Sequence, residues 1–368
     1  MNLMPTRYEA LLNTYEAYKE TGQFFLLKKG SGYSYLWGGD DLGLFFFVPL
    51  LGKKLGLSLD KAIIVFFLLI ITAGFLSASF YFIHKSRFSI LQRSYLFASL
   101  LFLAVSIYFI GDVYVISGTV PLLVIPLFLL SEDMSFSKKI AINLIIGIVM
   151  GYANTVRAHS GTTGLVFIIS YLLVNKSPLK TKILLLSVIL FAMTLSKFHF
   201  NYLIDARNKF LLNKNVEIAN KYSHVFWHNT FLGLGYVYNK YGIVPDDNCA
   251  FEWVKKIDAN AVYMSEQYEN ILRKEYFKFV IKHPGYVLSN YTAKAGVILA
   301  YILFSMNIAV FFLKPFKQQR QILPFFVAII FGVLPGFIFL PYNSYILGGI
   351  STAVLLANYI IKETFSGS

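Results

Sequence analysis

The sequence predicts an all-α polytopic membrane protein with about nine transmembrane helices, interfacial helices and one large extracytoplasmic loop. Hydrophobic residues make up 57% of the 368 residues and charged residues only 14%, whereas about 25% of the residues in a typical soluble domain are charged. The apolar residues gather in long blocks, as expected where lipid rather than water is the solvent. Lysine and arginine concentrate in alternate short loops between these blocks.

Nine apolar stretches approach or reach the length of about 17–25 residues that a helix needs to cross a bilayer. Several are short, the fifth most of all, and no heptad pattern or longer internal repeat accompanies them. The expected spans are residues 62–83, 94–111, 113–131, 139–156, 161–175, 181–197, 293–313, 321–340 and 344–361.

The charges of the connecting loops predict the orientation of the spans. Basic residues occupy every second loop, at 84–93, 138–139, 176–182 and 314–320. The loops between them carry Asp112, Arg157 or no basic residue. Because Lys and Arg in short loops mark the cytoplasmic side, residues 1–61 and the long loop 198–292 are expected on the extracytoplasmic side.

This topology divides the chain into four segments. They are an extracytoplasmic N-terminal segment with an acidic loop, the first six spans, the large extracytoplasmic loop, and the last three spans with a cytoplasmic tail, bounded at 1–61, 62–197, 198–292 and 293–368. Translocation of the N-terminal segment favours a further helix upstream of it. The alternatives are that this tail crosses unaided, or that Leu42–Leu51 crosses, although ten apolar residues are too few for a full span.

Three segments are predicted to be interfacial. Residues 6–22 carry apolar side chains at helical spacing and are expected to form a short helix over the outer face. Leu42–Leu51 contains Pro49 and precedes two lysines suited to headgroup level, which favours an interfacial or re-entrant element. Glu266–Ser289 is expected to be an amphipathic helix on the bilayer surface, because its apolar residues recur at helical spacing opposite Lys and Arg.

The first candidate site is the acidic pair Asp40 and Asp41, which stands among glycines before the interfacial run. Glycine permits close approach of a ligand to the backbone. A carboxylate partly removed from water can act as a general base, and two carboxylates can hold a divalent cation. The competing interpretation is a solvated turn, since Gly and Asp favour turns.

The second candidate site is Arg157 with His159, at the outer end of the fourth span. Arginine suits phosphate because its donors form a rigid fork. The alternative is an arginine that snorkels to the interface, which the positive-inside bias makes less natural on the outer side.

The third candidate site is Trp227 with His228 in the long loop, where an aromatic ring beside polar groups suits a sugar. His224 and His228 are spaced i, i+4, as two zinc ligands on a helix would be. No third ligand follows at a suitable spacing, and Cys249 is the only cysteine, which excludes a disulfide framework and any cysteine-based metal site.

The net charge of +14 does not indicate a nucleic-acid partner. A basic excess equally suits positive-inside loops and an anionic lipid surface. No basic stripe interleaved with aromatic residues occurs in a polar segment. Membrane lipids are therefore the expected partners, and nucleic acid is not.

In layout and in short motifs the chain resembles the bacterial members of the GT-C glycosyltransferase superfamily. The segment GGDDLGLFFFVPLLGKKLG resembles the acidic first outer loop of these enzymes, and NTVRAHSG resembles their arginine at an outer helix end. FWHNTFLGLG, NKYGI and KHPGYVLSNYTAKAG resemble stretches of bacterial membrane proteins of this type. The chain departs from the family because no span precedes the acidic loop, and because nine spans are fewer than many members have.

The resemblance implies transfer of a hexose or pentose from a polyprenyl-phosphate donor, at the outer face of a bacterial inner membrane. It implies that Asp40 or Asp41 is the general base and that Arg157 contacts the lipid phosphate. No further cofactor is certain, and a divalent cation remains open. The alternatives are a transporter or flippase, a polymerase or ligase of lipid-linked glycans, and a structural subunit. Few charges lie within the spans, which favours surface chemistry over transport.

Overall fold

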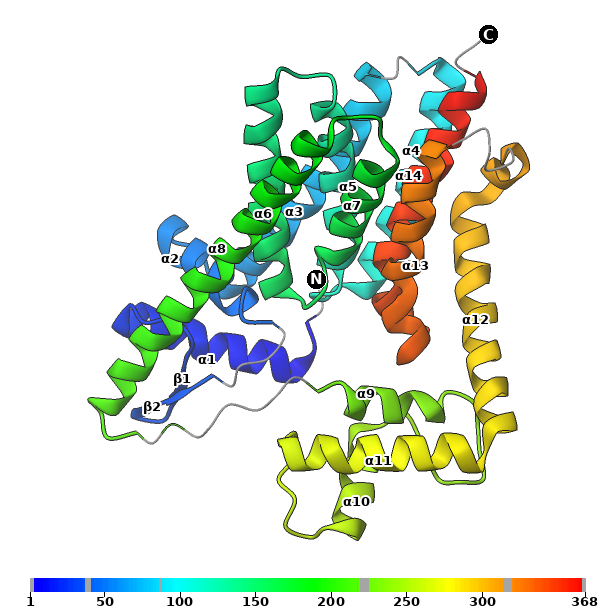
Figure 1. Ribbon diagram of the computed structural model, residues 1–368. Coiled ribbons are helices and arrows are strands. Elements are labelled where there is room, and N and C mark those ends of the chain that lie inside the picture. Colours follow the sequence, from blue (N-terminus) through cyan, green and yellow to red (C-terminus); the bar gives the residue numbers. More distant parts are fainter. Residues whose placement is uncertain are drawn as a thin grey trace. The chain divides into compact units, whose positions relative to one another are not determined.

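A computed structural model describes residues 3–36, 41–85, 88–216, 218, 225–313 and 320–365. The chain divides into two compact units, which are described separately below (Figure 1). Unit 1 comprises Met1–Ala219, Ser305–Gly332 and Leu347–Ser368. Unit 2 comprises Asn220–Phe304 and Val333–Ile346.

Every one of the nine expected spans is a helix, so the prediction of a multi-pass α-helical membrane protein is confirmed. Six of these helices are long and apolar enough to cross a membrane, and three are shorter apolar helices. The exact number of spans stays a prediction. The nine helices are α3 (Leu59–Phe80), α4 (Ile90–Ile110), α5 (Val115–Ser131), α6 (Phe136–Val156), α7 (Thr162–Val174), α8 (Leu179–Leu212), α12 (Pro284–Met306), α13 (Leu323–Ile338) and α14 (Asn343–Phe365). Short turns η1 (Tyr81–Lys85), η3 (Asn307–Phe312) and η5 (Arg320–Ile322) extend three of them.

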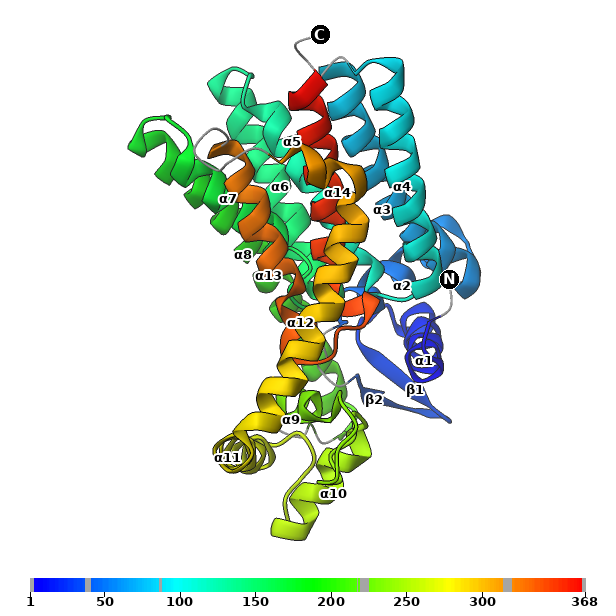
Figure 2. The same ribbon diagram turned by 90° about the vertical axis from the view of Figure 1, so that its right-hand side faces the viewer.

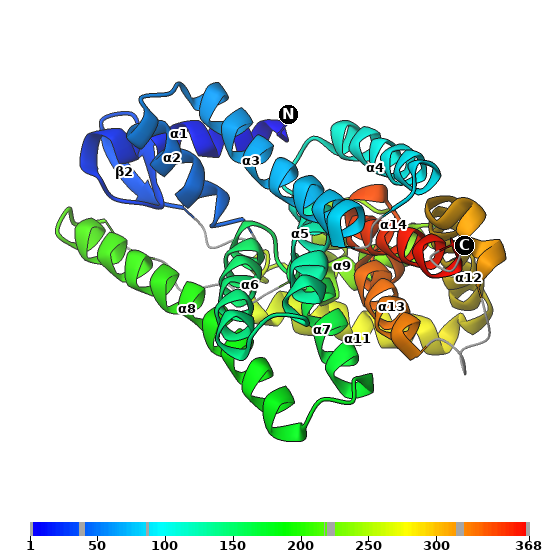
Figure 3. The ribbon, with the colours of Figure 1, turned by 90° about the horizontal axis from the view of Figure 1, so that it is seen from above.

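Helix α14 lies at the centre of unit 1, among α4, α5, α7 and α13 (Figure 3). Most of its residues are buried, whereas α3 and α4 expose apolar side chains such as Leu76 and Phe97. Close approach to α14 depends on glycine, because a Cβ atom on Gly118 of α5 would lie 2.5 Å from Leu347. The exposed apolar faces of the outer helices are those of a bundle surrounded by lipid.

Helices α6 and α8 pack through two glycines of α6. A Cβ atom on Gly147 would lie 2.5 Å from the carbonyl oxygen of Ile189, and one on Gly151 would lie 2.8 Å from that of Met193. Small residues let helix backbones approach closely within a membrane. This contact fixes where the end of α6 meets the middle of α8.

The N-terminal segment of unit 1 folds onto the end of the bundle. It contains α1 (Pro5–Thr21), the antiparallel strands β1 (Leu26–Lys29) and β2 (Gly32–Tyr35), and α2 (Leu44–Leu55). The helix expected at residues 6–22 is present as α1, and Leu42–Leu51, expected to be an interfacial or re-entrant element, lies largely in helix α2. The hairpin is the one departure from an all-α chain within the described residues. Gly52 of α2 lies under the ring of Tyr15, where a Cβ atom would clash.

The helix ends of unit 1 alternate as the loop charges predict (Figures 1 and 2). The C-terminal ends of α3, α5 and α7 lie together at one end of the unit, near the C-terminus of α14. The opposite end carries the α4–α5 turn, the α6–α7 turn and residues 41–43. Which end faces the cytoplasm stays a prediction.

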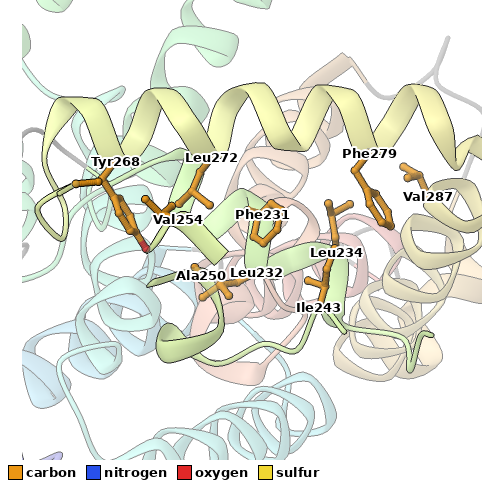
Figure 4. Packing of buried hydrophobic residues seen from close by; sticks show 11 residues of the cluster. Phe231, Leu232, Leu234, Ile243, Ala250, Val254, Tyr268, Leu272, Phe279 and Val287 are labelled. Atoms are coloured by element: carbon orange, nitrogen blue, oxygen red, sulfur yellow. The ribbon is translucent and has the colours of Figure 1, made fainter. Parts of the chain in front are cut away.

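Unit 2 contains α9 (Trp227–Leu232), the turn η2 (Gly233–Gly235), α10 (Asp247–Ile257), α11 (Glu266–Lys282), most of α12, the end of α13 and the start of α14. A cluster that includes Phe231, Leu234, Tyr268 and Leu272 forms its core (Figure 4). The expected helix Glu266–Ser289 is interrupted at His283, and α12 begins at Pro284 rather than at 293. Proline suits a first helical turn, where no backbone N–H needs an intrahelical partner.

Candidate functional site

The acidic loop is anchored on both sides of residues 37–40, which lie outside the described residues. Before them, the Leu36 carbonyl accepts a hydrogen bond from Arg207 of α8 at 2.9 Å. After them, the Gly43 N–H donates to the Thr155 carbonyl oxygen at 2.7 Å. A Cβ atom on Gly43 would lie 2.5 Å from Thr155 Oγ1 and 2.7 Å from the Val156 backbone nitrogen. Glycine is therefore what allows the loop to dock directly on the end of α6.

This docking brings Asp41 and Arg157 together, as expected of a shared site. Arg157 ends α6 in an extended conformation, and its Nη1 lies 3.5 Å from Asp41 Oδ1. Its guanidinium also lies over the ring of Tyr114, 4.4 Å from the ring centroid. The geometry of unit 1 therefore brings together residues of the first and second candidate sites.

The second oxygen of Asp41 is held by an arginine that the sequence analysis missed. Arg7 of α1 donates from Nε to Asp41 Oδ2 at 2.6 Å. Oδ1 is buried and accepts no hydrogen bond from the part of the chain that the structure describes. Buried polar atoms nearly always have a hydrogen-bond partner, so such an oxygen requires an explanation. A ligand that donates a proton to this oxygen is one.

Asp112 completes the charge cluster. Arg7 Nη1 contacts Asp112 Oδ2, and the Asp112 Oδ1 accepts the Val113 N–H at 2.7 Å. Burial lowers the pKa of Arg7, but attraction to Asp41 and Asp112 outweighs it and raises the pKa above the ordinary value. The cluster therefore holds two cations and two carboxylates, with all four side chains less than one-fifth exposed.

A cavity of about 380 Å³ adjoins this cluster. Leu42, which follows Asp41, and Ala158, which follows Arg157, both line it. One part of its wall is polar, from Asn154, Lys197 and Asn201, and the remainder is mainly apolar. The other lining residues are Gly151, Thr155, Met193, Ser196, Phe200 and Ile204, so most of the cavity lies between α6 and α8.

The two remaining residues predicted for these sites are Asp40 and His159. Asp40 lies outside the described residues. His159 is exposed in the α6–α7 turn with a φ of 67°, the left-handed region that favours glycine or asparagine. Its carbonyl accepts the Thr162 N–H at 3.0 Å. Its predicted role in substrate binding stays a prediction.

Trp227 and His228 belong to unit 2, at the start of α9. The Trp227 ring packs near Tyr276 and Phe277, with centroid distances of 5.8 and 5.4 Å. His228 is buried between Tyr268 Oη, 2.7 Å from its Nδ1, and Asp247 Oδ1, 3.0 Å from its Nε2. A neutral imidazole with its proton on Nε2 satisfies both partners. The role of these residues in sugar binding stays a prediction.

The described residues contain no group of three or more His, Cys, Asp and Glu side chains placed to hold a metal ion. Both nitrogens of His228 are engaged, and His224 lies outside the described residues. Asp41 and Asp112 share the guanidinium of Arg7.

Arg7, the partnership of Asp112 and the cavity residue Lys197 were not predicted from the sequence. Asp112 had a visible signal, since it stands in a short loop on the same predicted side as Arg157. Arg7 lies 34 residues from Asp41 and 105 from Asp112, and nothing in its local sequence distinguishes it from a solvated helix residue.

No protein-family model matches the chain, and no curated protein matches it. Among solved structures, the chain is similar to the crystal structure of ArnT from Cupriavidus metallidurans in the apo state. The TM-score is 0.40 at 15% identity, over 98% of this chain and 73% of that one. Because a TM-score below 0.5 does not establish a common fold, the function is inferred from the site itself.

Proposed function

We propose that this protein is a membrane glycosyltransferase that moves a sugar from a polyprenyl-phosphate donor to a hydroxyl acceptor. The observation that carries the proposal is the buried Oδ1 of Asp41, which accepts no hydrogen bond from the described residues and lies beside Arg157 and a partly polar cavity. The sequence resemblance to GT-C enzymes supplies the donor class.

The reaction needs a base for the acceptor hydroxyl and positively charged side chains that stabilise the leaving phosphate. Asp41 Oδ1 takes the proton of the acceptor hydroxyl, whose oxygen then forms a bond to the anomeric carbon of the sugar. The bond from that carbon to the phosphate oxygen breaks, and the lipid phosphate leaves with the electron pair. Arg157 and Lys197 offset the negative charge on that phosphate.

The location of the site suits a lipid-borne donor. The cluster lies at one end of the unit 1 bundle, at the ends of α5 and α6. The cavity beside it has a polar wall for a sugar and an apolar wall for the first isoprene units. On the orientation predicted from the loops, this end faces the extracytoplasmic side of a bacterial inner membrane.

A transporter is the main competing function, and no observation in the structure favours it. The described charges of the site lie at a bundle end, whereas transporters commonly bind ions and substrates near the midplane. Solute flux in proteoliposomes that contain the purified chain distinguishes the two functions. Flux without sugar transfer would support transport.

The direct test is Asp41→Asn, which keeps the size of the side chain and removes its basicity. We expect glycan or glycolipid output to fall by about 10²–10⁴-fold, the usual contribution of a general base. The matched control is Asp60→Asn, at an exposed carboxylate at the start of α3. Unchanged output from Asp41→Asn at normal expression would reject Asp41 as the base.

A further inference from the structure

Arg7 makes two directed contacts to carboxylates from distant parts of the chain. Its Nε donates to Asp41 of the acidic loop, and its Nη1 contacts Asp112 of the α4–α5 turn. The guanidinium is planar and presents its donors in fixed directions. Because two of these donors contact carboxylates, the plane of the Arg7 guanidinium is fixed.

Asp112 is itself held in place. Its Oδ1 accepts the N–H of Val113 at 2.7 Å, which leaves Oδ2 for Arg7. The preceding Gly111 ends α4 with a φ of 58°, a conformation that glycine adopts without strain. The α4–α5 turn thus presents one carboxylate oxygen in a defined direction.

The helix that carries Arg7 is anchored at its other end. The Tyr15 hydroxyl donates to the Leu57 carbonyl oxygen, and its ring covers Gly52 of α2. Lys53 of α2 lies over the Tyr18 ring, 4.7 Å from its centroid. These contacts hold helix α1 in place, so the position of Arg7 at its start is defined.

From this geometry we infer that Arg7 is a positioning residue for the proposed reaction, oriented by Asp112. Arg7 occupies Oδ2 of Asp41 and so leaves Oδ1 directed toward Arg157. The inference rests on the proposed function, since Asp41 is taken as the base. Arg7 itself need not touch the sugar, the acceptor or the phosphate.

The test uses the purified full chain in detergent and compares Arg7→Lys, Asp112→Asn and the double variant. Turnover is measured as release of decaprenyl phosphate from decaprenyl-phosphoryl glucose and from its arabinose counterpart, with a membrane lipid extract as acceptor. Lysine keeps the charge but cannot make both contacts in one plane. The matched control is Glu9→Gln, at an exposed position of α1.

We expect Arg7→Lys to lower kcat about 30-fold with KM within about threefold, because positioning affects the reacting geometry more than binding. Asp112→Asn is expected to lower kcat by a smaller factor. The double variant is expected to be no worse than Arg7→Lys alone, since the two residues act as one unit. Glu9→Gln is expected to match the wild type.

Two outcomes would overturn the inference. One is wild-type kcat in Arg7→Lys while Asp41→Asn is inactive, and the other is multiplicative losses in the double variant. If Arg7→Lys does not fold, Asp112→Asn decides alone, because a wild-type kcat there removes the proposed orientation of Arg7. An active Asp41→Asn would instead reject the proposed function, so the two failures are distinguishable.

Discussion

The charge cluster of unit 1 and the polar network of unit 2 are built from similar side chains in different ways. In unit 1, one oxygen of Asp41 is buried and accepts no hydrogen bond from the described residues. In unit 2, Glu269 is also buried, but it accepts the backbone N–H groups of Phe226, Trp227 and His228 at 2.7–3.0 Å. Residues 225–304 contain no buried side-chain polar atom without a hydrogen bond, whereas Asn343 Oδ1, in the second segment of unit 2, is such an atom.

We interpret this difference as one between a buried carboxylate that stabilises the fold and a buried carboxylate that binds a ligand. A carboxylate that satisfies three backbone donors at the start of α9 stabilises the fold, and removing it leaves those donors unpaired. A buried carboxylate oxygen that accepts no hydrogen bond costs free energy, and at Asp41 we propose that a ligand supplies the hydrogen bond. We therefore expect substitutions in the unit 1 cluster to alter rate, and those in the unit 2 network to alter stability.

Gly43→Ala should give the largest effect of the four changes below. The new Cβ atom would meet Thr155 and the backbone of Val156 within 2.7 Å, so the acidic loop must move away from α6. We expect turnover to fall at least about 100-fold, the order of loss for a displacement near 1 Å. Decaprenyl phosphate release measures it, with Gly296→Ala as control, because no atom lies within 4 Å of that added Cβ. Full turnover in Gly43→Ala would show that the docked loop is not required.

Glu269→Ala should mainly lower stability. Three backbone donors lose their acceptor, and we expect the free energy of unfolding of unit 2 to fall by about 2 kcal/mol. Thermal or denaturant unfolding of the purified chain measures the change. Glu266→Ala, on the exposed first turn of the same helix, is the control and should cost little. Equal losses in both variants would remove the distinction drawn between the two regions.

Lys197→Gln should weaken donor binding. Lys197 lines the cavity beside Asp41, and loss of a charge-assisted contact to phosphate is expected to raise KM for the decaprenyl-phosphate sugar about tenfold. Lys180→Gln, near the opposite end of α8, is the matched control. An unchanged KM in Lys197→Gln would place the phosphate elsewhere.

Asp247→Asn should give the smallest effect, visible in the pH dependence of stability. The hydrogen bond with His228 lowers the pKa of Asp247. The stability that this pairing supplies is therefore present above the unfolded pKa of about 3.9 and is lost as the pH falls through the lower folded value. Because the side chain is 75% exposed, screening limits the effect to about 0.5 kcal/mol. Unfolding curves of both proteins between pH 3 and 7 measure it, and a gap that widens toward low pH would contradict the assignment.

The sequence by itself determined the helices of this protein. Blocks of apolar residues as long as 62–83 and 344–361 have no stable form in lipid other than a helix that satisfies its own backbone. The alternation of basic loops likewise predicted which helix ends lie together in unit 1. The hairpin at residues 26–35 escaped prediction, because it depends on a local turn rather than on a long pattern.

The tertiary structure alone decided the site. Asp41 and Arg157 were each visible as polar residues in an unusual place, but their meeting depends on the space that Gly43 leaves against Thr155. The contribution of Arg7 could not be predicted, since a contact across 105 residues leaves no local periodicity or spacing to detect. The hydrophobic pattern of a helix depends on residues that are close together in the sequence. The direction of a carboxylate oxygen depends on donors from distant parts of the chain, which only tertiary packing brings near it.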